Sequence, residues 1–218
     1  MERYQLFIEY VGTNFRGWQI QKTGLTIQGL IQKNLKKLLN EKTVLIGSGR
    51  TDSGVHAIEQ SAHFDCKKKI RNLESFAKSI NHFLNPKDVA IIKIKKRSNN
   101  FHSRFSAKQR IYKYVIFNQS SLPVIEKNRG WYLRKPLDLE LMKKGAKKLI
   151  GSNDFSTFRS SSCTARSPIK TIKSIKIKSF KNKIEIEFKS KSFLQQQVRS
   201  MVGCLKYLAE KKLTLKTF

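Results

Sequence analysis

The stretch GRTDSGVHA, residues 49–57, places one carboxylate, Asp52, in a glycine-rich segment of a strongly basic chain. The sequence holds 45 Lys and Arg residues against 15 Asp and Glu residues, so an acid at this place stands out. Gly47, Gly49 and Gly54 permit an unusual backbone path and the close approach of another molecule. We therefore interpret the segment as an exposed loop that can present Asp52 to a partner.

The chemistry open to Asp52 depends on its neighbour Arg50. In a locally extended segment, residues two apart point to the same side, so we expect Arg50 and Asp52 to form an ion pair. A carboxylate beside a guanidinium stays ionised at neutral pH, which makes it a poor general acid. A positioned anion suits nucleophilic attack or metal binding, and the alternative is a turn in which the pair has a purely structural role.

Metal binding is the main rival to nucleophilic attack. The potential ligands near the loop are Asp52, His56, His63 and Asp65. They form no H-E-x-x-H or paired-cysteine pattern, and strand alternation places His63 and Asp65 opposite Phe64, where surface polar positions explain them. We therefore expect no metal site.

A second candidate feature is RIYKYVIF, residues 110–117, which has the composition of a strand. Alternation gives it two faces, one with Ile111, Val115 and Phe117 and the other with Arg110, Tyr112 and Tyr114. We expect the first face to lie on the core and the second to be a basic, aromatic surface. A nucleobase stacks on such a surface with ~1–3 kcal/mol per base, and the alternative is two tyrosines that cover a helix.

The third candidate feature is the segment SFLQQQVRSMVGCLKYLAE, residues 192–210, which has apolar residues at helical spacing. Arg199 lies beside Val198, at the border of the apolar stripe. A long arginine stem can lie on apolar surface while its charged head reaches an anion, either a carboxylate such as Asp52 or a phosphate.

The elements that must position these residues form two similar halves. In the first half, the pattern predicts strands at 4–10, 43–47, 58–65 and 88–96 and helices at 26–40 and from Asn72 to Pro86. In the second half, it predicts strands at 109–117, 130–134, 169–178 and 183–189 and helices at 138–150 and 193–210. The polar stretch RSNN suggests domains 1–98 and 99–218. We expect an α+β fold in which each half is an antiparallel sheet with helices on one face, and a basic cleft lies between the halves.

The composition points to a polyanionic partner. The formal net charge is +30, which favours nucleic acid over a membrane surface, although part of the lysine can simply be a solvated face. The three cysteines are far apart and in no C-x-x-C pair, so neither a disulfide framework nor a zinc ribbon is supported. The N-terminus carries charges where a signal peptide would be apolar, and no run of ~18 apolar residues occurs, so we expect a cytoplasmic protein with no membrane partner.

Taken together, several segments resemble the tRNA pseudouridine synthases of the TruA family. They are YVGTNFRGWQIQ, GRTDSGVHA, FHSRFSAKQRIYKY, GSNDFSTF, TARSPIKTI and SFLQQQVRSMVG, and they follow the order of the family through nearly the whole chain. The resemblance implies that Asp52 is the catalytic nucleophile. It also implies that Tyr112 stacks on the target base, with Arg50 and Arg199 as basic neighbours of Asp52 that bind the substrate.

The resemblance further implies conversion of uridine to pseudouridine at positions 38, 39 and 40 of the tRNA anticodon stem-loop, without cofactor or essential metal, by a homodimer. The residues expected to bind the RNA are Arg16, Lys22, His102, Arg104, Arg110 and Arg166. Members of the family usually continue beyond the position of Phe218 into a further apolar strand. The alternative function is therefore a noncatalytic, basic RNA-binding module, which would need the charge but not Asp52.

Overall fold

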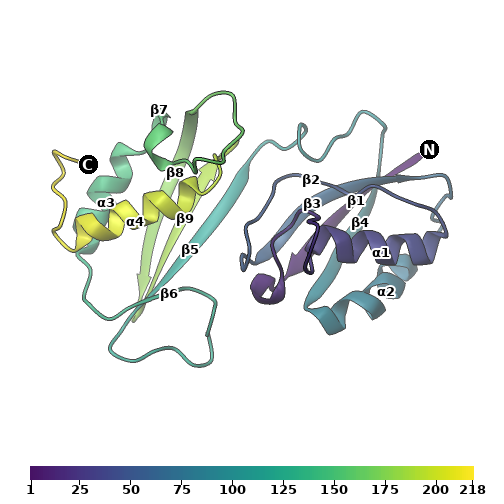
Figure 1. Ribbon diagram of the computed structural model, residues 1–218, viewed down its shortest axis with the longest axis horizontal. Helices are drawn as coiled ribbons and strands as arrows, with labels where there is room; N and C mark the ends of the chain where they lie inside the picture. Colours follow the sequence, from purple (N-terminus) through teal and green to yellow (C-terminus); the bar gives the residue numbers. More distant parts are fainter. The chain divides into compact units, whose positions relative to one another are not determined.

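The structure is a computed structural model that describes residues 1–218 and divides into two compact units, Met1–Ala107 and Lys108–Phe218. Each unit is a β-sheet with its helices packed on one face (Figure 1). The expected α+β fold of two similar halves is therefore confirmed. None of the helices is long and apolar enough to cross a membrane.

The first unit contains a four-stranded antiparallel sheet in the order β2-β3-β1-β4. Its strands are β1 (Glu2–Tyr10), β2 (Ile46–Gly47), β3 (Ala57–Cys66) and β4 (Val89–Arg97). Its helices are α1 (Ile27–Leu39) and α2 (Leu73–Leu84), with single 3-10 turns η1 (Gly12–Asn14) and η2 (Asn85–Lys87). All six of the elements expected in this half are present.

Local chemistry explains where these elements begin and end. The Thr26 side chain accepts a hydrogen bond from the Gly29 N–H at the start of α1, and Asn72 does the same for Ser75 at the start of α2. β1 alternates as a half-buried strand should, with Tyr4, Leu6, Ile8 and Tyr10 buried on the face that the helices cover. The sheet that carries Asp52 therefore rests on one continuous apolar core.

The second unit contains a five-stranded sheet in the order β6-β5-β9-β8-β7. Its strands are β5 (Arg110–Asn118), β6 (Trp131–Leu133), β7 (Gly151–Asp154), β8 (Ile169–Phe180) and β9 (Lys183–Ser190). Its helices are α3 (Leu139–Lys148) and α4 (Gln197–Ala209), with a 3-10 turn η3 (Ser156–Phe158). The sheet is antiparallel except for the parallel pair β5–β6, and β7 was not expected from the sequence.

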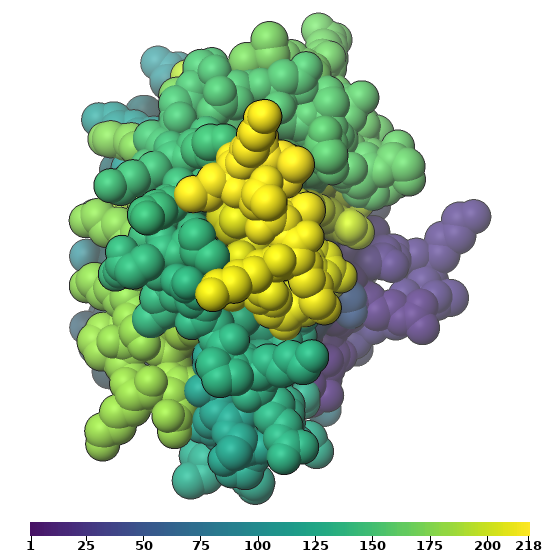
Figure 2. Space-filling model, turned by 90° about the vertical axis from the view of Figure 1, so that its left-hand side faces the viewer, coloured from purple at the N-terminus to yellow at the C-terminus, as the bar shows by residue number.

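The helix α4 begins later than the expected residue 193. Gln196 has a left-handed backbone with φ of 62°, which no helical residue adopts, so residues 193–196 form a turn that leads into the helix. After α4 the chain folds back, and Phe218 packs near Gly145 of α3. Figure 2 shows this C-terminal segment in yellow against the green surface of the same unit.

The expected assignment of the two faces of β5 is wrong. Ile111 is 56% exposed, whereas Tyr112 and Tyr114 pack against the buried core around Ile116 that α3 and α4 cover. Phe117 is buried on the other face, where Gly130 passes close to its ring. Both faces of β5 thus carry apolar residues that become covered, and alternation within one strand cannot show which face the helices take.

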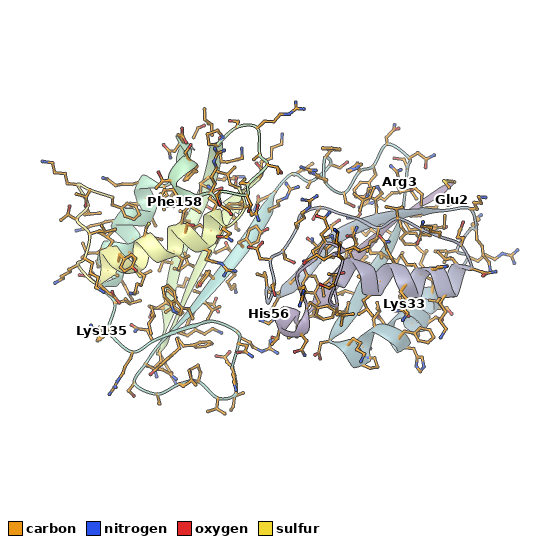
Figure 3. All side chains as sticks on the ribbon, in the orientation of Figure 1. Glu2, Arg3, Lys33, His56, Lys135 and Phe158 are labelled. Atoms are coloured by element: carbon orange, nitrogen blue, oxygen red, sulfur yellow. The ribbon has the colours of Figure 1, made fainter.

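The expected surface position of His63 is also wrong, because the segment Ser98–Ser106 covers this face of β3. His63 is 1% exposed, and its Nδ1 lies 3.0 Å from the Ser103 hydroxyl and accepts the Ser103 N–H at 3.2 Å. Arg3, labelled in Figure 3, donates two hydrogen bonds of 2.7 Å to the Asp65 carboxylate. It also donates to the backbone carbonyls of Asn99 and Phe101, each at 2.6 Å.

The burial of His63 predicts a pH-dependent stability. Burial, with smaller contributions from the charges of Arg3 and His102, lowers the pKa of His63 to about 4, against the opposing influence of Asp65. The unfolded chain therefore binds a proton near pH 6.5 that the folded chain takes up only near pH 4, so stability falls as the pH falls through this window. We expect a loss of about 2 kcal/mol between pH 7 and pH 5 from this residue.

Urea unfolding at pH 7, 6 and 5 measures this loss, and a His63→Asn variant provides the control because it has no titrating ring. The difference in unfolding free energy between the two proteins should narrow as the pH falls. Parallel pH profiles for the two proteins would show that His63 is not held in its neutral form.

Candidate active site

Asp52 lies in the loop between β2 and β3, and the chain turns directly after it. The Asp52 carbonyl accepts the Val55 N–H at 3.2 Å, and Gly54 has a left-handed φ of 77°. The side chain of Asp52 is half-buried, while Arg50 is exposed. The expected Arg50–Asp52 ion pair is absent from the salt bridges of the chain.

One side of the Asp52 loop is held by residues 10–18, which we call the β1–α1 segment. The Trp18 N–H donates to the Thr51 carbonyl at 3.0 Å, and the hydroxyls of Tyr10 and Thr51 are 2.8 Å apart. The Phe15 carbonyl accepts both the Ser53 hydroxyl at 3.1 Å and the Gly54 N–H at 3.3 Å. The residues immediately before and after Asp52 are thus fixed by hydrogen bonds to one neighbouring segment.

Steric fit reinforces these hydrogen bonds at two glycines of the β1–α1 segment. A Cβ added to Gly17 would lie 2.6 Å from the Thr51 carbonyl oxygen and 3.1 Å from the Asp52 carbonyl carbon, and Gly17 has a φ of 85°. A Cβ added to Gly12 would lie 2.0 Å from the Val55 carbonyl oxygen. Real Cβ atoms do not approach backbone atoms this closely, so only glycine allows the two segments to pack at this distance.

The start and the end of the loop have their own anchors. Gln60 of β3 donates to the Gly49 carbonyl at 2.6 Å, and the Ser48 N–H donates to the Ser61 carbonyl at 2.8 Å. At the other end, the Nδ1 of His56, labelled in Figure 3, accepts the Gly12 N–H at 3.1 Å. His56 therefore has a structural hydrogen bond at Nδ1.

The second unit contains two of the expected site residues, Tyr112 and Arg199, and places an unexpected phenylalanine beside the first. The Tyr112 ring meets the Phe193 ring edge to face, with centroids 5.1 Å apart. Burial raises the pKa of the neighbouring Tyr114, and the positive charge of Arg199, which is exposed in the first turn of α4, opposes this rise. Tyr112 thus packs on the helical face of this sheet beside Phe193, and Arg199 lies on α4, one of the helices of the same unit.

The expected RNA-binding residues are distributed over both units. Arg16 and Lys22 are exposed on the loop that follows β1, where the Arg16 guanidinium donates to the Thr23 hydroxyl at 3.0 Å. His102 and Arg104 lie in the segment Ser98–Ser106. In the second unit, Arg110 donates to the Lys191 carbonyl, and Arg166 is exposed just before β8.

No three His, Cys, Asp or Glu side chains of the chain form a group that could hold a metal ion. The potential ligands near the loop are engaged elsewhere, since His63 bonds Ser103 and Asp65 pairs with Arg3. The hydrogen bond and the charge of Arg3 hold the pKa of the Asp65 carboxyl below its usual value.

Comparison with known proteins places this geometry in a family. The sequence model of a family described as tRNA pseudouridine synthase matches residues 6–106 and 146–218, which together are most of the chain. The chain belongs to the tRNA pseudouridine synthase family. Pseudouridine synthases are isomerases.

Two curated relatives, each named tRNA pseudouridine synthase A, agree with this assignment. The chain is 68% identical over its full length of 218 residues to the protein of Pelagibacter ubique strain HTCC1062, of which it covers 89%. It is 41% identical over 212 residues to the protein of Paramagnetospirillum magneticum strain AMB-1, of which it covers 82%. The expectation from the sequence motifs is confirmed at the level of the family.

The residues that the sequence did not single out are those that hold the loop of this family member in place. Tyr10, Gly12, Gly17 and Trp18 lie in YVGTNFRGWQIQ, a segment that contributes to the family resemblance but to which the sequence assigns no role. The available signal was the spacing of small and aromatic residues in YVGTNFRGW, because glycines between buried aromatic rings are typical of close backbone packing.

The packing of Gly17 predicts a specific loss of activity. In Gly17→Ala the new methyl group must push Thr51 and Asp52 away, and a shift on the order of 1 Å can cost ~100-fold in rate. We expect pseudouridine formation to fall by that order in kcat with little change in RNA affinity. Single-turnover kinetics and a binding titration measure the two effects.

The matched control is Gly151→Ala in the second unit. Gly151 also has a positive φ, of 105°, but a Cβ there would meet nothing within 4 Å. Both variants carry the strain of a positive φ, and Gly17→Ala adds the clash with Thr51, so its melting temperature should fall further than that of Gly151→Ala. Only Gly17→Ala should lower the turnover of the folded protein. A folded Gly17→Ala protein with wild-type kcat would show that the position of Asp52 does not depend on this contact.

Proposed function

We propose that the chain is a tRNA pseudouridine synthase that isomerises uridine at positions 38, 39 and 40 of the anticodon stem-loop, with Asp52 as the nucleophile. The observation that carries the proposal is a half-buried carboxylate in no salt bridge, on a loop held from both sides, in a chain of net charge +30. A noncatalytic RNA-binding module gains nothing from an anion that faces phosphates, because like charges repel. The names of the two relatives supply the tRNA substrate for this proposal.

The reaction breaks the bond between N1 of uracil and C1′ of the sugar and forms a bond between C5 and C1′. The C5 proton leaves and N1 gains a proton, so no oxidant or reductant is needed. An anionic carboxylate can begin this exchange by attack on the sugar or on the base. The loop contacts keep the Asp52 backbone in one place, which lowers the entropic cost of attack.

Substrate binding supplies the remaining requirements. The target uridine must leave its stack, at a cost of a few kcal/mol, and stacking on an aromatic ring together with phosphate contacts offsets this cost. We propose Tyr112 for the stacking contact and Arg50 and Arg199 for contacts to the substrate. Arg16, Lys22, His102, Arg104, Arg110 and Arg166 are proposed for the phosphates, in a protein that acts as a homodimer without cofactor or metal.

The nucleophile is tested with Asp52→Asn. The amide has nearly the shape of the carboxylate but cannot attack as an anion, so pseudouridine formation should fall below detection while the melting temperature and tRNA affinity are kept. Mapping of pseudouridine in tRNA after incubation with the protein measures the product and its position.

The control for this substitution is Asp88→Asn, which removes the same charge at an exposed residue with a left-handed φ of 57° that asparagine tolerates. It should leave turnover unchanged. Near wild-type turnover in Asp52→Asn would exclude Asp52 as the nucleophile and favour a different site.

The role of Tyr112 is tested by separating stacking from packing. Tyr112 is partly buried against the core of its unit, so Tyr112→Phe should keep both fold and RNA affinity, whereas Tyr112→Leu should lose ~1–3 kcal/mol of base stacking. A loss of turnover in Tyr112→Phe without a loss of RNA affinity would give the hydroxyl a role in proton transfer.

Melting curves are recorded beside the single-turnover rates of both Tyr112 variants. If Tyr112→Leu lowers the melting temperature strongly while the folded fraction keeps its catalytic rate, Tyr112 is a core residue and the stacking assignment fails.

A further inference from the structure

The segment Ser98–Ser106 is an ordered loop that ends in an exposed aromatic ring. The loop is closed by internal hydrogen bonds, from the Phe101 N–H to the Ser98 carbonyl at 3.0 Å and from the Ser106 N–H to the His102 carbonyl at 2.8 Å. The His102 N–H in turn donates to the Ser106 hydroxyl at 3.0 Å. Phe105, at the end of this loop, is 75% exposed.

The same segment is anchored to the sheet. Arg3 of β1 binds the carbonyls of Asn99 and Phe101, and buried His63 of β3 binds both the backbone and the hydroxyl of Ser103. These contacts place the loop against the end of β3 that carries Asp65. Phe105 is therefore exposed on a loop that these contacts hold in place.

Three aromatic rings form a column that leads from the core to the surface. The His102 ring meets buried His63 edge to face, with centroids 4.8 Å apart and an angle of 64°, and lies 4.4 Å from the Phe105 ring at an angle of 33°. The Nδ1 of His102 accepts the N–H groups of Arg104 and Phe105, at 3.2 and 3.4 Å, which fixes the ring. Phe105 is the outermost ring of the column.

Cations lie beside this column. The Arg104 guanidinium is 5.8 Å from the centroid of Phe105 and is exposed, and the Arg97 guanidinium is 5.1 Å from the centroid of Phe101. A flat aromatic ring next to a guanidinium offers the two contacts that a nucleotide needs, a surface for its base and a charge for its phosphate. Base stacking requires an unpaired base, because bases within a duplex are covered by their neighbours.

We propose that Phe105 is a stacking platform for an unpaired RNA base other than the target uridine, with Arg104 as the contact to the adjoining phosphate. The proposal rests on the proposed function for its RNA partner. Thr51, next to Asp52, is held by Tyr10, which pairs with Ala57 of β3, whereas the Phe105 loop is held by His63, six residues and about 20 Å further along that strand. Because the two loops are anchored at separate places on β3, Phe105 suits a second unpaired nucleotide of the same RNA.

The test compares Phe105→Leu with Phe105→Tyr in binding titrations with tRNA. Leucine keeps the apolar character and loses the ring face, so affinity should fall roughly 5- to 150-fold, which corresponds to ~1–3 kcal/mol. Tyrosine keeps the ring and should bind within about twofold of wild type. For a fully paired RNA duplex, all three proteins should bind equally.

The matched control is Phe180→Leu, since Phe180 is another exposed phenylalanine, 55% exposed, at the end of β8. It should bind tRNA as the wild type does. Turnover adds a second readout, because loss of a distant binding contact should raise KM for Phe105→Leu and leave kcat unchanged.

The possible failures are distinguishable. Wild-type tRNA affinity in Phe105→Leu overturns the stacking proposal but not the proposed function, which depends on Asp52→Asn. A wild-type protein that binds no tRNA overturns both. If Phe105→Leu changes the sedimentation of the protein alone and not its tRNA affinity, the ring is a contact between protein chains and the proposal is wrong.

Discussion

The close packing of the β1–α1 segment on the Asp52 loop is the contact on which the site depends. Two kinds of interaction hold it, and they differ in magnitude. Tyr10, Phe15 and Trp18 are buried beneath the loop, and burial of each ring contributes ~2–3 kcal/mol. The hydrogen bonds to Thr51, Ser53 and Gly54 contribute only ~1 kcal/mol each. The apolar burial therefore supplies most of the stability, and the hydrogen bonds determine where the loop comes to rest.

The net charge of the chain does not show that several of its acidic residues are already paired with lysines. Several of the few acidic residues pair with lysines, as Glu185 does with Lys113 at 3.0 Å and Glu187 with Lys189 at 3.0 Å on β9. Such partly exposed pairs contribute little to stability, at most ~1 kcal/mol each, but they neutralise the carboxylates involved. Asp52 is in none of these pairs. A carboxylate outside these salt bridges is what the proposed role of nucleophile requires.

The sequence predicted the parts of the fold that depend on local chemistry. The helices α1, α2 and α3 begin at the expected places, where the side chains of Thr26, Asn72 and Asp138 each accept a backbone N–H, and β1 lies at the expected strand. The motif GRTDSGVHA located the candidate site for the same reason, since glycines and a lone acid are local features. The family resemblance then supplied roles for residues that no local pattern could assign.

The remaining predictions failed where the outcome depends on what covers a surface. The alternation of its strand predicts a surface position for His63, but a segment 35 or more positions away in the sequence covers it. The core face and the outer face of β5 are the reverse of those expected, because α3 and α4 pack on the face that carries Tyr112. Which face the helices cover depends on the connections between the elements, and the pattern of a single strand does not contain this information. The Arg50–Asp52 ion pair is expected from an extended segment, whereas residues 50–52 lie in an irregular loop outside any strand, and the pair is absent.

A change of register between β1 and β3 aligns the β1–α1 segment with the Asp52 loop. β1 pairs with β3 so that Ile8 lies opposite Gln60, but Tyr10 lies opposite Ala57, so β3 holds one extra residue there. Such bulges are frequent beside active sites, because they redirect a strand end without loss of the pairing further along. Without the extra residue, Tyr10 would face Ile58, and the loop would be displaced by one residue relative to Gly12 and Trp18. The hydrogen bonds to His56 and Thr51 would then no longer meet their partners, so the bulge is a structural condition for the position of Asp52.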